Sequence, residues 1–96
     1  MTLKYLKDHI LEEIEGALDY MEKAIEYKGT DWGSMFYLHS CDELRHANHL
    51  VKIFNETKKS ENSTDAEHVA MYKEIMEAYS TSMGKIEAMK KLYWAE

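Results

Sequence analysis

Apolar residues recur at alternating spacings of three and four along most of the chain, and two short polar breaks divide this pattern into three stretches. A pattern of this period predicts amphipathic helices. Proline is absent and only four glycines occur, which favours long helices over turn-rich sheets. We therefore expect an all-α fold, with helices over about residues 2–28, 31–59 and 65–95 in one domain that spans 1–96.

The two breaks contain residue types that end and begin helices. The first break covers residues 28–31, where Gly29 suits a helix C-terminus and Thr30 or Asp31 suits the N-cap of the next helix. The second break covers residues 60–65, a polar cluster whose last three residues can each cap the third helix. Because the first break is short, the first two helices should be antiparallel neighbours.

Each helix should bury one stripe of the apolar pattern. The stripe expected in the first helix is Leu6, Ile10, Glu13, Ala17, Tyr20, Ala24 and Tyr27. The stripe expected in the second helix is Phe36, His39, Glu43, His46, Leu50 and Ile53. The stripe expected in the third helix is Val69, Tyr72, Met76, Tyr79, Met83, Ile86 and Tyr93.

Three chemically reactive polar residues lie inside these stripes: Glu13 in the first helix, and Glu43 and His46 in the second. An unpaired buried carboxylate costs several kcal/mol, so such groups normally pair, take up a proton or bind a metal ion. Residues equidistant from the turn of an antiparallel hairpin lie level, and the midpoint between Glu13 and the other two falls near Gly29. The spacing of three keeps Glu43 and His46 on one face. We therefore expect the three groups to meet.

One chain supplies two carboxylates and one imidazole, and a two-fold partner would supply the same set again. Four carboxylates and two imidazoles suit two carboxylate-rich metal ions better than a closed tetrahedral zinc site. A chain of 96 residues has a limited core, which also favours self-association.

Composition restricts the other partners. Eighteen acidic against 12 basic residues give a net charge of −6, which repels phosphate backbones and attracts cations, so we expect no nucleic-acid partner. No apolar run approaches the roughly 20 residues that cross a bilayer, and the N-terminus lacks the apolar core of a signal peptide, so we expect no membrane partner. The single cysteine, Cys41, agrees with a reducing compartment. These features predict a cytoplasmic protein.

The segments around these groups resemble the ferritin-like di-iron carboxylate superfamily. Glu13 followed seven residues later by Tyr20 resembles the first ligand segment of bacterioferritins, and the Asp-Glu-x-x-His-Ala stretch around Glu43 and His46 resembles the second. Rubrerythrins share the same general pattern. The step from Glu13 to Glu43 is similar to that of encapsulated ferritins, which are half-ferritins that dimerise around a di-iron centre. The resemblance covers about residues 3–57.

This resemblance implies a four-helix di-iron bundle that is completed by homodimerisation, or within a larger even-numbered homo-oligomer. It implies Glu13 and His46 as terminal iron ligands, Glu43 as a bridging ligand, and Tyr20 as an outer neighbour or redox partner. These four residues form the expected catalytic set for ferroxidase-type oxidation of Fe(II) by dioxygen or peroxide. No second Glu and Glu-x-x-His half follows downstream, so one chain alone cannot complete the centre.

Other functions remain open. Glu13, Glu43 and His46 can form a structural salt-bridge cluster in a non-catalytic homo-oligomer, or bind zinc or manganese without turnover. The third helix, for which we expect no ligand role, can instead dock another protein in a helical adaptor. For His9, four residues before Glu13, we expect a position on the helix surface. For His39, one turn before Glu43, we expect a core or rim position.

Overall fold

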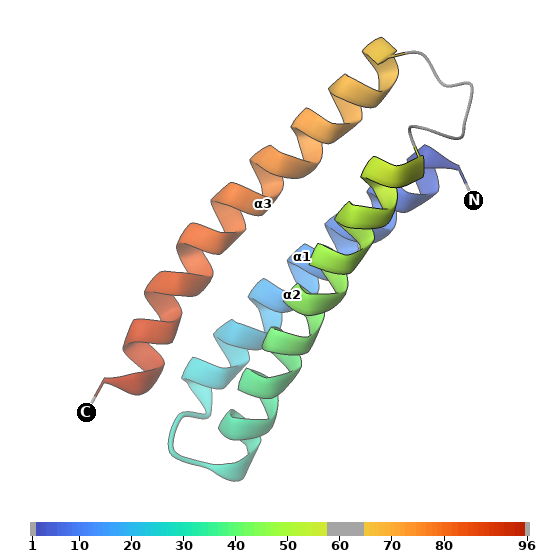
Figure 1. The fold of residues 1–96 in the computed structure, drawn as a ribbon. Coiled ribbons are helices and arrows are strands. Elements are labelled where there is room, and N and C mark those ends of the chain that lie inside the picture. Colours follow the sequence, from blue (N-terminus) through green and yellow to red (C-terminus); the bar gives the residue numbers. More distant parts are fainter. Residues whose placement is uncertain (1, 58–64, 96) are drawn as a thin grey trace.

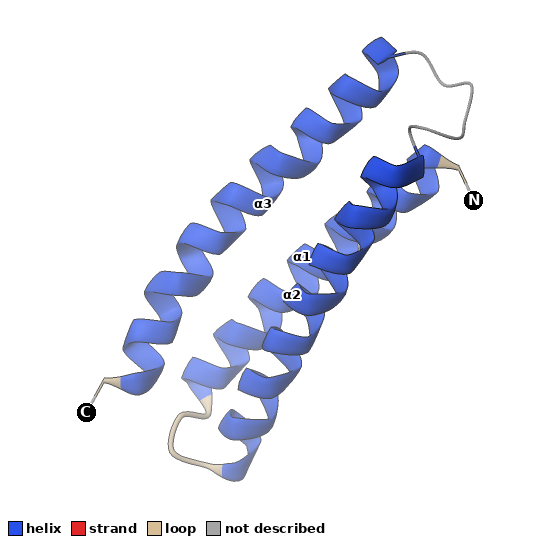
Figure 2. Ribbon diagram, in the orientation of Figure 1, coloured by secondary structure: helices blue, strands red, loops and turns tan. Residues whose placement is uncertain are grey.

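The computed structural model describes residues 2–57 and 65–95. These residues form three helices, α1 (Leu3–Glu26), α2 (Asp31–Thr57) and α3 (Asp65–Trp94), and the described chain contains no strand (Figures 1 and 2). The expected all-α class with three helices is confirmed; the expected end of the second helix at residue 59 lies outside the described residues. Gly84 does not interrupt α3, which continues through it.

The central helix is α1, which lies against both of the others (Figure 1). α2 runs antiparallel to α1, whereas α3 runs parallel to it. Near their starts, Lys7 Nζ of α1 lies 3.3 Å from Glu74 Oε2 of α3. At the other end, Lys28 Nζ donates to the carbonyl oxygen of Leu92 at 2.8 Å. No Cα atom of α2 comes within 8 Å of one in α3, so the backbone of α3 approaches only α1, and its contacts with α2 are made by side chains.

The turn between α1 and α2 follows from local chemistry. Gly29 adopts a φ of 85°, the left-handed conformation that ends helices and that glycine adopts without steric cost. Thr30 Oγ1 accepts a hydrogen bond of 3.2 Å from the backbone N–H of Gly33, so Thr30 caps α2. A Cβ atom at Gly33 would overlap the carbonyl oxygen of Tyr27. Both expectations for this break are confirmed; the cap expected for α3, at residues 63–65, lies outside the described side chains.

The buried stripe of α1 differs slightly from the expected one. It consists of Leu3, Leu6, Ile10, Ile14, Ala17, Met21 and Ala24. Ile14 and Met21 thus occupy the centre of the packed face, and their neighbours Glu13 and Tyr20 lie at its edge, partly exposed. Tyr27, which we expected to be inward, is 41% exposed.

The stripe expected in α2 is wrong by one position. The buried residues are Gly33, Ser40, Leu44, Ala47 and Phe54. Each of the last four follows by one residue a position that we expected to face inward. Gly33, Ser40 and Ala47 are small, so α1 and α2 can approach closely there. The Ser40 hydroxyl group donates to the carbonyl oxygen of Ala17 at 2.6 Å. The stripe containing Glu43 and His46 lies beside this contact.

α3 is anchored at both ends. His68 is buried, and its ring packs on Phe54 with centroids 4.6 Å apart. At the opposite end, the indole N–H of Trp94 donates to the hydroxyl oxygen of Tyr37 at 3.0 Å. Ile86 is buried as expected, but Val69, which we expected to face inward, is 57% exposed.

Candidate metal centre

The structure brings Glu13 of α1 together with Glu43 and His46 of α2. One potential ligand atom from each residue lies within 4.8 Å of the other two. His46 Nδ1 lies 3.8 Å from Glu13 Oε2 and 4.0 Å from Glu43 Oε1. The hairpin register is responsible, because the turn at Gly29 places these residues at the same height on adjacent helices.

The Glu13 carboxylate is the most enclosed of the three groups. Its side chain is 15% exposed, against 28% for Glu43 and 51% for His46. The Oε2 atom of Glu13 is buried and accepts no hydrogen bond from the described residues. A buried oxygen without a partner is costly, because folding has removed the water that would solvate it. A cation at this position would satisfy that oxygen.

The proximity of the two carboxyl groups raises the pKa of Glu43 to about 7, from an ordinary value of 4.5. The main cause is that a proton on Glu43 can be shared with Glu13 in a hydrogen bond. Burial and the negative charge of Glu13 act in the same direction, and His46 opposes them. The pair thus favours a proton or another positive charge between its oxygens.

Gly16 leaves room for the Glu43 side chain. A Cβ atom at Gly16 would lie 3.2 Å from Glu43 Oε2, closer than ordinary packing allows. We did not expect Gly16 to be part of the site from the sequence. The sequence did contain a signal for Gly16. Glycine inside a helix costs roughly 1 kcal/mol of stability relative to alanine, so a glycine at such a position usually has a packing or functional reason.

His9 also contributes to the surroundings of Glu13. We expected it on the helix surface, and it is partly exposed, but its Nε2 atom lies 3.4 Å from Glu13 Oε1. The other ring nitrogen, Nδ1, lies 3.9 Å from Glu12 Oε2. The spacing of four residues, which places two side chains on one face of a helix, is the signal for this contact.

Tyr20 lies outside the three-residue cluster. Its ring packs on His39, with centroids 5.2 Å apart, and on Phe36, with centroids 6.1 Å apart. No hydrogen bond within the described chain joins it to the three candidate ligands. Tyr20 is therefore part of an aromatic group on the same side of the hairpin, nearer to the turn than the candidate ligands. His39, for which we expected a core or rim position, is exposed.

The cluster lies on the side of the α1–α2 hairpin that faces away from α3, which we call the open face. Lys7 of α1 and Tyr37 of α2 both contact α3. Lys7 lies six residues before Glu13, and Tyr37 lies six residues before Glu43. Six residues rotate the direction of a side chain by about 120° around a helix. A depression of about 610 Å³ adjoins the cluster on this face and is lined in part by Gly16.

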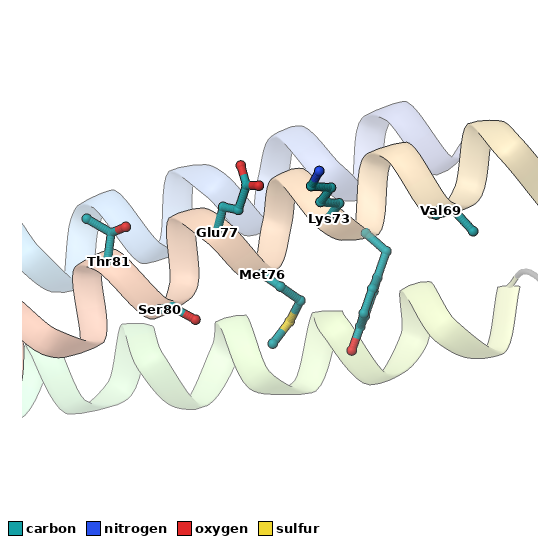
Figure 3. A pocket seen from close by; sticks show the side chains of 7 residues that line it. Val69, Lys73, Met76, Glu77, Ser80 and Thr81 are labelled. Atoms are coloured by element: carbon teal, nitrogen blue, oxygen red, sulfur yellow. The ribbon is translucent and has the colours of Figure 1, made fainter.

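A second depression, of about 660 Å³, lies along α3 (Figure 3). Its lining includes Val69, Met76 and Ser80, with Lys73 and Glu77 pointing to the other side of the helix in this view. It contains none of the candidate ligands. The candidate ligands are on the open face and not in this depression.

The donor set of the cluster fits a metal ion that prefers oxygen with some nitrogen. Two carboxylates and one imidazole are ligands of iron, manganese and zinc in proteins. The unpartnered Glu13 Oε2 atom and the raised pKa of Glu43 both indicate that positive charge is favoured here.

Comparison with known proteins yields no further guide to this site. No protein-family model matches the chain, and no curated protein or solved structure matches it. Within the described residues, none of the helices combines the length and apolar character that a membrane span requires. The function is therefore inferred from the geometry of the site.

Proposed function

We propose that this chain is a ferritin-like di-iron protein that binds two iron ions at a homodimer interface and oxidises Fe(II). The observation that carries the proposal is the convergence of Glu13, Glu43 and His46 on the open face of the hairpin, with ligand atoms within 4.8 Å of one another. The resemblance of the flanking segments to bacterioferritins and encapsulated ferritins supports it.

The need for a second copy follows from the number of donors. One chain offers two carboxylates and one imidazole, whereas two iron ions in a carboxylate-rich centre take four carboxylates and two imidazoles. A two-fold axis through the open face would supply the missing set. Exposed aromatic side chains on this face, including Trp32 at 62% exposure, suit burial against another copy. A larger even-numbered oligomer would use the same contact.

Each residue has a distinct role in this proposal. Glu13 and His46 would hold iron as terminal ligands and Glu43 would hold it as the bridging ligand, and the carboxylate charge would stabilise the ferric product. When bound, the iron pair supplies one electron from each ion to dioxygen or peroxide. The net charge of −6 draws Fe(II) toward the protein. Tyr20, packed on His39, is the redox or outer partner on the same face.

Anaerobic titration with Fe(II), followed by admission of air, tests the proposal. We expect two irons per dimer and their oxidation in air, and we expect Glu43→Ala to lose both. Glu77→Ala, which removes an exposed acid of α3, should behave as the unchanged chain. Any stoichiometry other than two irons per dimer, or the absence of oxidation, contradicts the proposal.

A second candidate is a homo-oligomer in which the same cluster is structural, or binds zinc or manganese without turnover. It is favoured by the ion-pair distances from His46 Nδ1 to both carboxylates, which need no metal. An unchanged melting temperature after addition of Fe(II), Mn(II) and Zn(II) would support the metal-free version. In either case we place the protein in the cytoplasm, in keeping with the free cysteine Cys41.

A further inference from the structure

The two oxygens of the Glu13 carboxylate have different surroundings. Oε2 is buried, lies 3.8 Å from His46 Nδ1, and accepts no hydrogen bond from the described residues. Oε1 points the other way and lies 3.4 Å from His9 Nε2. One oxygen is thus directed into the candidate metal centre, and the other toward a histidine of the same helix.

The His9 side chain is 40% exposed, and its ring contacts three residues of the same helix. Tyr5, one turn earlier, stacks on it with centroids 6.1 Å apart and planes inclined by 11°. Its Nδ1 atom lies 3.9 Å from Glu12 Oε2, while Nε2 faces Glu13. The two ring nitrogens therefore face different carboxylates. Because the two nitrogens of the His9 ring point in different directions, they cannot both bind the same metal ion.

We propose that His9 is a positioning residue for the metal centre. Its Nε2 atom, 3.4 Å from Glu13 Oε1, would hold that oxygen and leave Oε2 free to bind the metal ion. A carboxylate held in this way binds through one oxygen in a fixed orientation, whereas a free one can rotate or chelate through both. This inference rests on the proposed function, since it requires Glu13 to be a ligand.

Cobalt(II), added alone to the full-length chain, is a suitable probe because calorimetry gives its affinity and stoichiometry and visible absorption reports its coordination. We expect His9→Ala to weaken Co(II) binding by about tenfold without changing the number of ions per chain. His9→Gln, which keeps an N–H donor near the position of Nε2, should restore most of the affinity. His49→Ala, which removes an exposed histidine of α2, should have no effect.

The melting temperature of the metal-free variants separates positioning from a merely structural role. Positioning predicts that His9→Ala and His9→Gln melt together but differ in Co(II) affinity and absorption. Equal affinity in His9→Ala and the unchanged chain would overturn the inference, and so would the loss of an ion, which would make His9 a ligand. If the unchanged chain and Glu13→Ala bind Co(II) equally, the proposed function itself fails.

Discussion

Glu13 and Glu43 illustrate how two ordinary carboxyl groups acquire unusual properties from their positions on adjacent helices. Neither has a lysine or arginine partner among the ion pairs of the described residues; His9 lies 3.4 Å from Glu13, and His46 lies within 4.0 Å of both carboxyl groups. Burial and mutual repulsion then favour a shared proton, which explains the raised pKa of Glu43. The same arrangement that stabilises a proton would stabilise a metal ion, and the two would compete.

The first prediction concerns the pH dependence of the metal-free chain. A carboxyl group with a higher pKa in the folded state binds its proton more tightly when folded. Its contribution to the free energy of unfolding is therefore fully present below the ordinary value of 4.5 and is lost as the pH rises through about 7. We expect Glu43→Gln to be more stable than the unchanged chain at about pH 8 and to lose that advantage at about pH 5.

Urea denaturation of the metal-free proteins at both pH values measures this difference. Glu77→Gln provides the control, since Glu77 is an exposed residue of α3. A Glu43→Gln variant with the same pH dependence as the unchanged chain would show that the Glu13–Glu43 pair does not hold a proton.

At the scale of the helices, the α1–α2 hairpin depends on small residues at its closest contacts. Gly33 lies against the backbone of Tyr27, and the Ser40 hydroxyl group donates to the carbonyl oxygen of Ala17. Gly16 fulfils a different role, because it makes room for the Glu43 side chain. Close packing and the shape of the candidate site therefore come from the same helix pair.

Gly16→Ala and Gly84→Ala form a matched pair of substitutions inside helices. Nothing lies within 4 Å of a Cβ atom at Gly84, so this substitution should raise the free energy of unfolding by about 1 kcal/mol through helix propensity alone. Gly16→Ala should gain less, because the Glu43 carboxylate must move, and should weaken Co(II) binding by about tenfold. Denaturation and calorimetry check both quantities; equal Co(II) affinity in the two variants would contradict this role for Gly16.

The turn supplies a second comparison between glycines. Gly29→Ala places a Cβ atom in the left-handed conformation and should cost about 1 kcal/mol of stability. Gly33→Ala should cost more, about 3 kcal/mol, because its Cβ atom would meet the carbonyl oxygen of Tyr27, which is backbone and cannot move aside. Far-UV circular dichroism during thermal unfolding measures both. The reverse order of stabilities would contradict this account.

The turn could be predicted from sequence because its residues act locally, as Gly29 and Thr30 show. The buried face of α2 could not. The expected stripe was based on apolar and aromatic residues such as Phe36 and Leu50. The observed contact between α1 and α2 uses Ser40 and Ala47, whose small size matters more than their hydropathy. Close approach of two helices depends on the partner helix, which a single helical pattern does not contain.

At the scale of the whole molecule, the two sides of the α1–α2 hairpin differ. One side of the hairpin packs against α3 (Figure 1). The open face carries the candidate ligands and exposed aromatic residues. The sequence predicted that Glu13, Glu43 and His46 would meet, because the turn alone sets that register. The position of α3 did not follow from its pattern, since Val69, Leu92 and other apolar residues remain exposed on it.

Self-association through the open face gives the last prediction. Trp32→Glu places a charge on this face and should shift the chain from dimer, or larger oligomer, to monomer in sedimentation equilibrium, because burying an unpaired charge is costly. Leu38→Glu, at a similarly exposed position on another side of α2, should leave the mass unchanged. Monomeric behaviour of the unchanged chain, or dimerisation of the Trp32→Glu variant, would contradict the prediction.

The chain has two tryptophans, and they lie in separate environments. The Trp94 indole is hydrogen-bonded to Tyr37, where α3 ends beside α2, while Trp32 stacks on Phe36 at the open face. Their fluorescence can therefore be assigned to separate events. In a chain with Trp32→Phe, emission follows the release of α3; in one with Trp94→Phe, a blue shift with rising concentration would record the covering of the open face in real time.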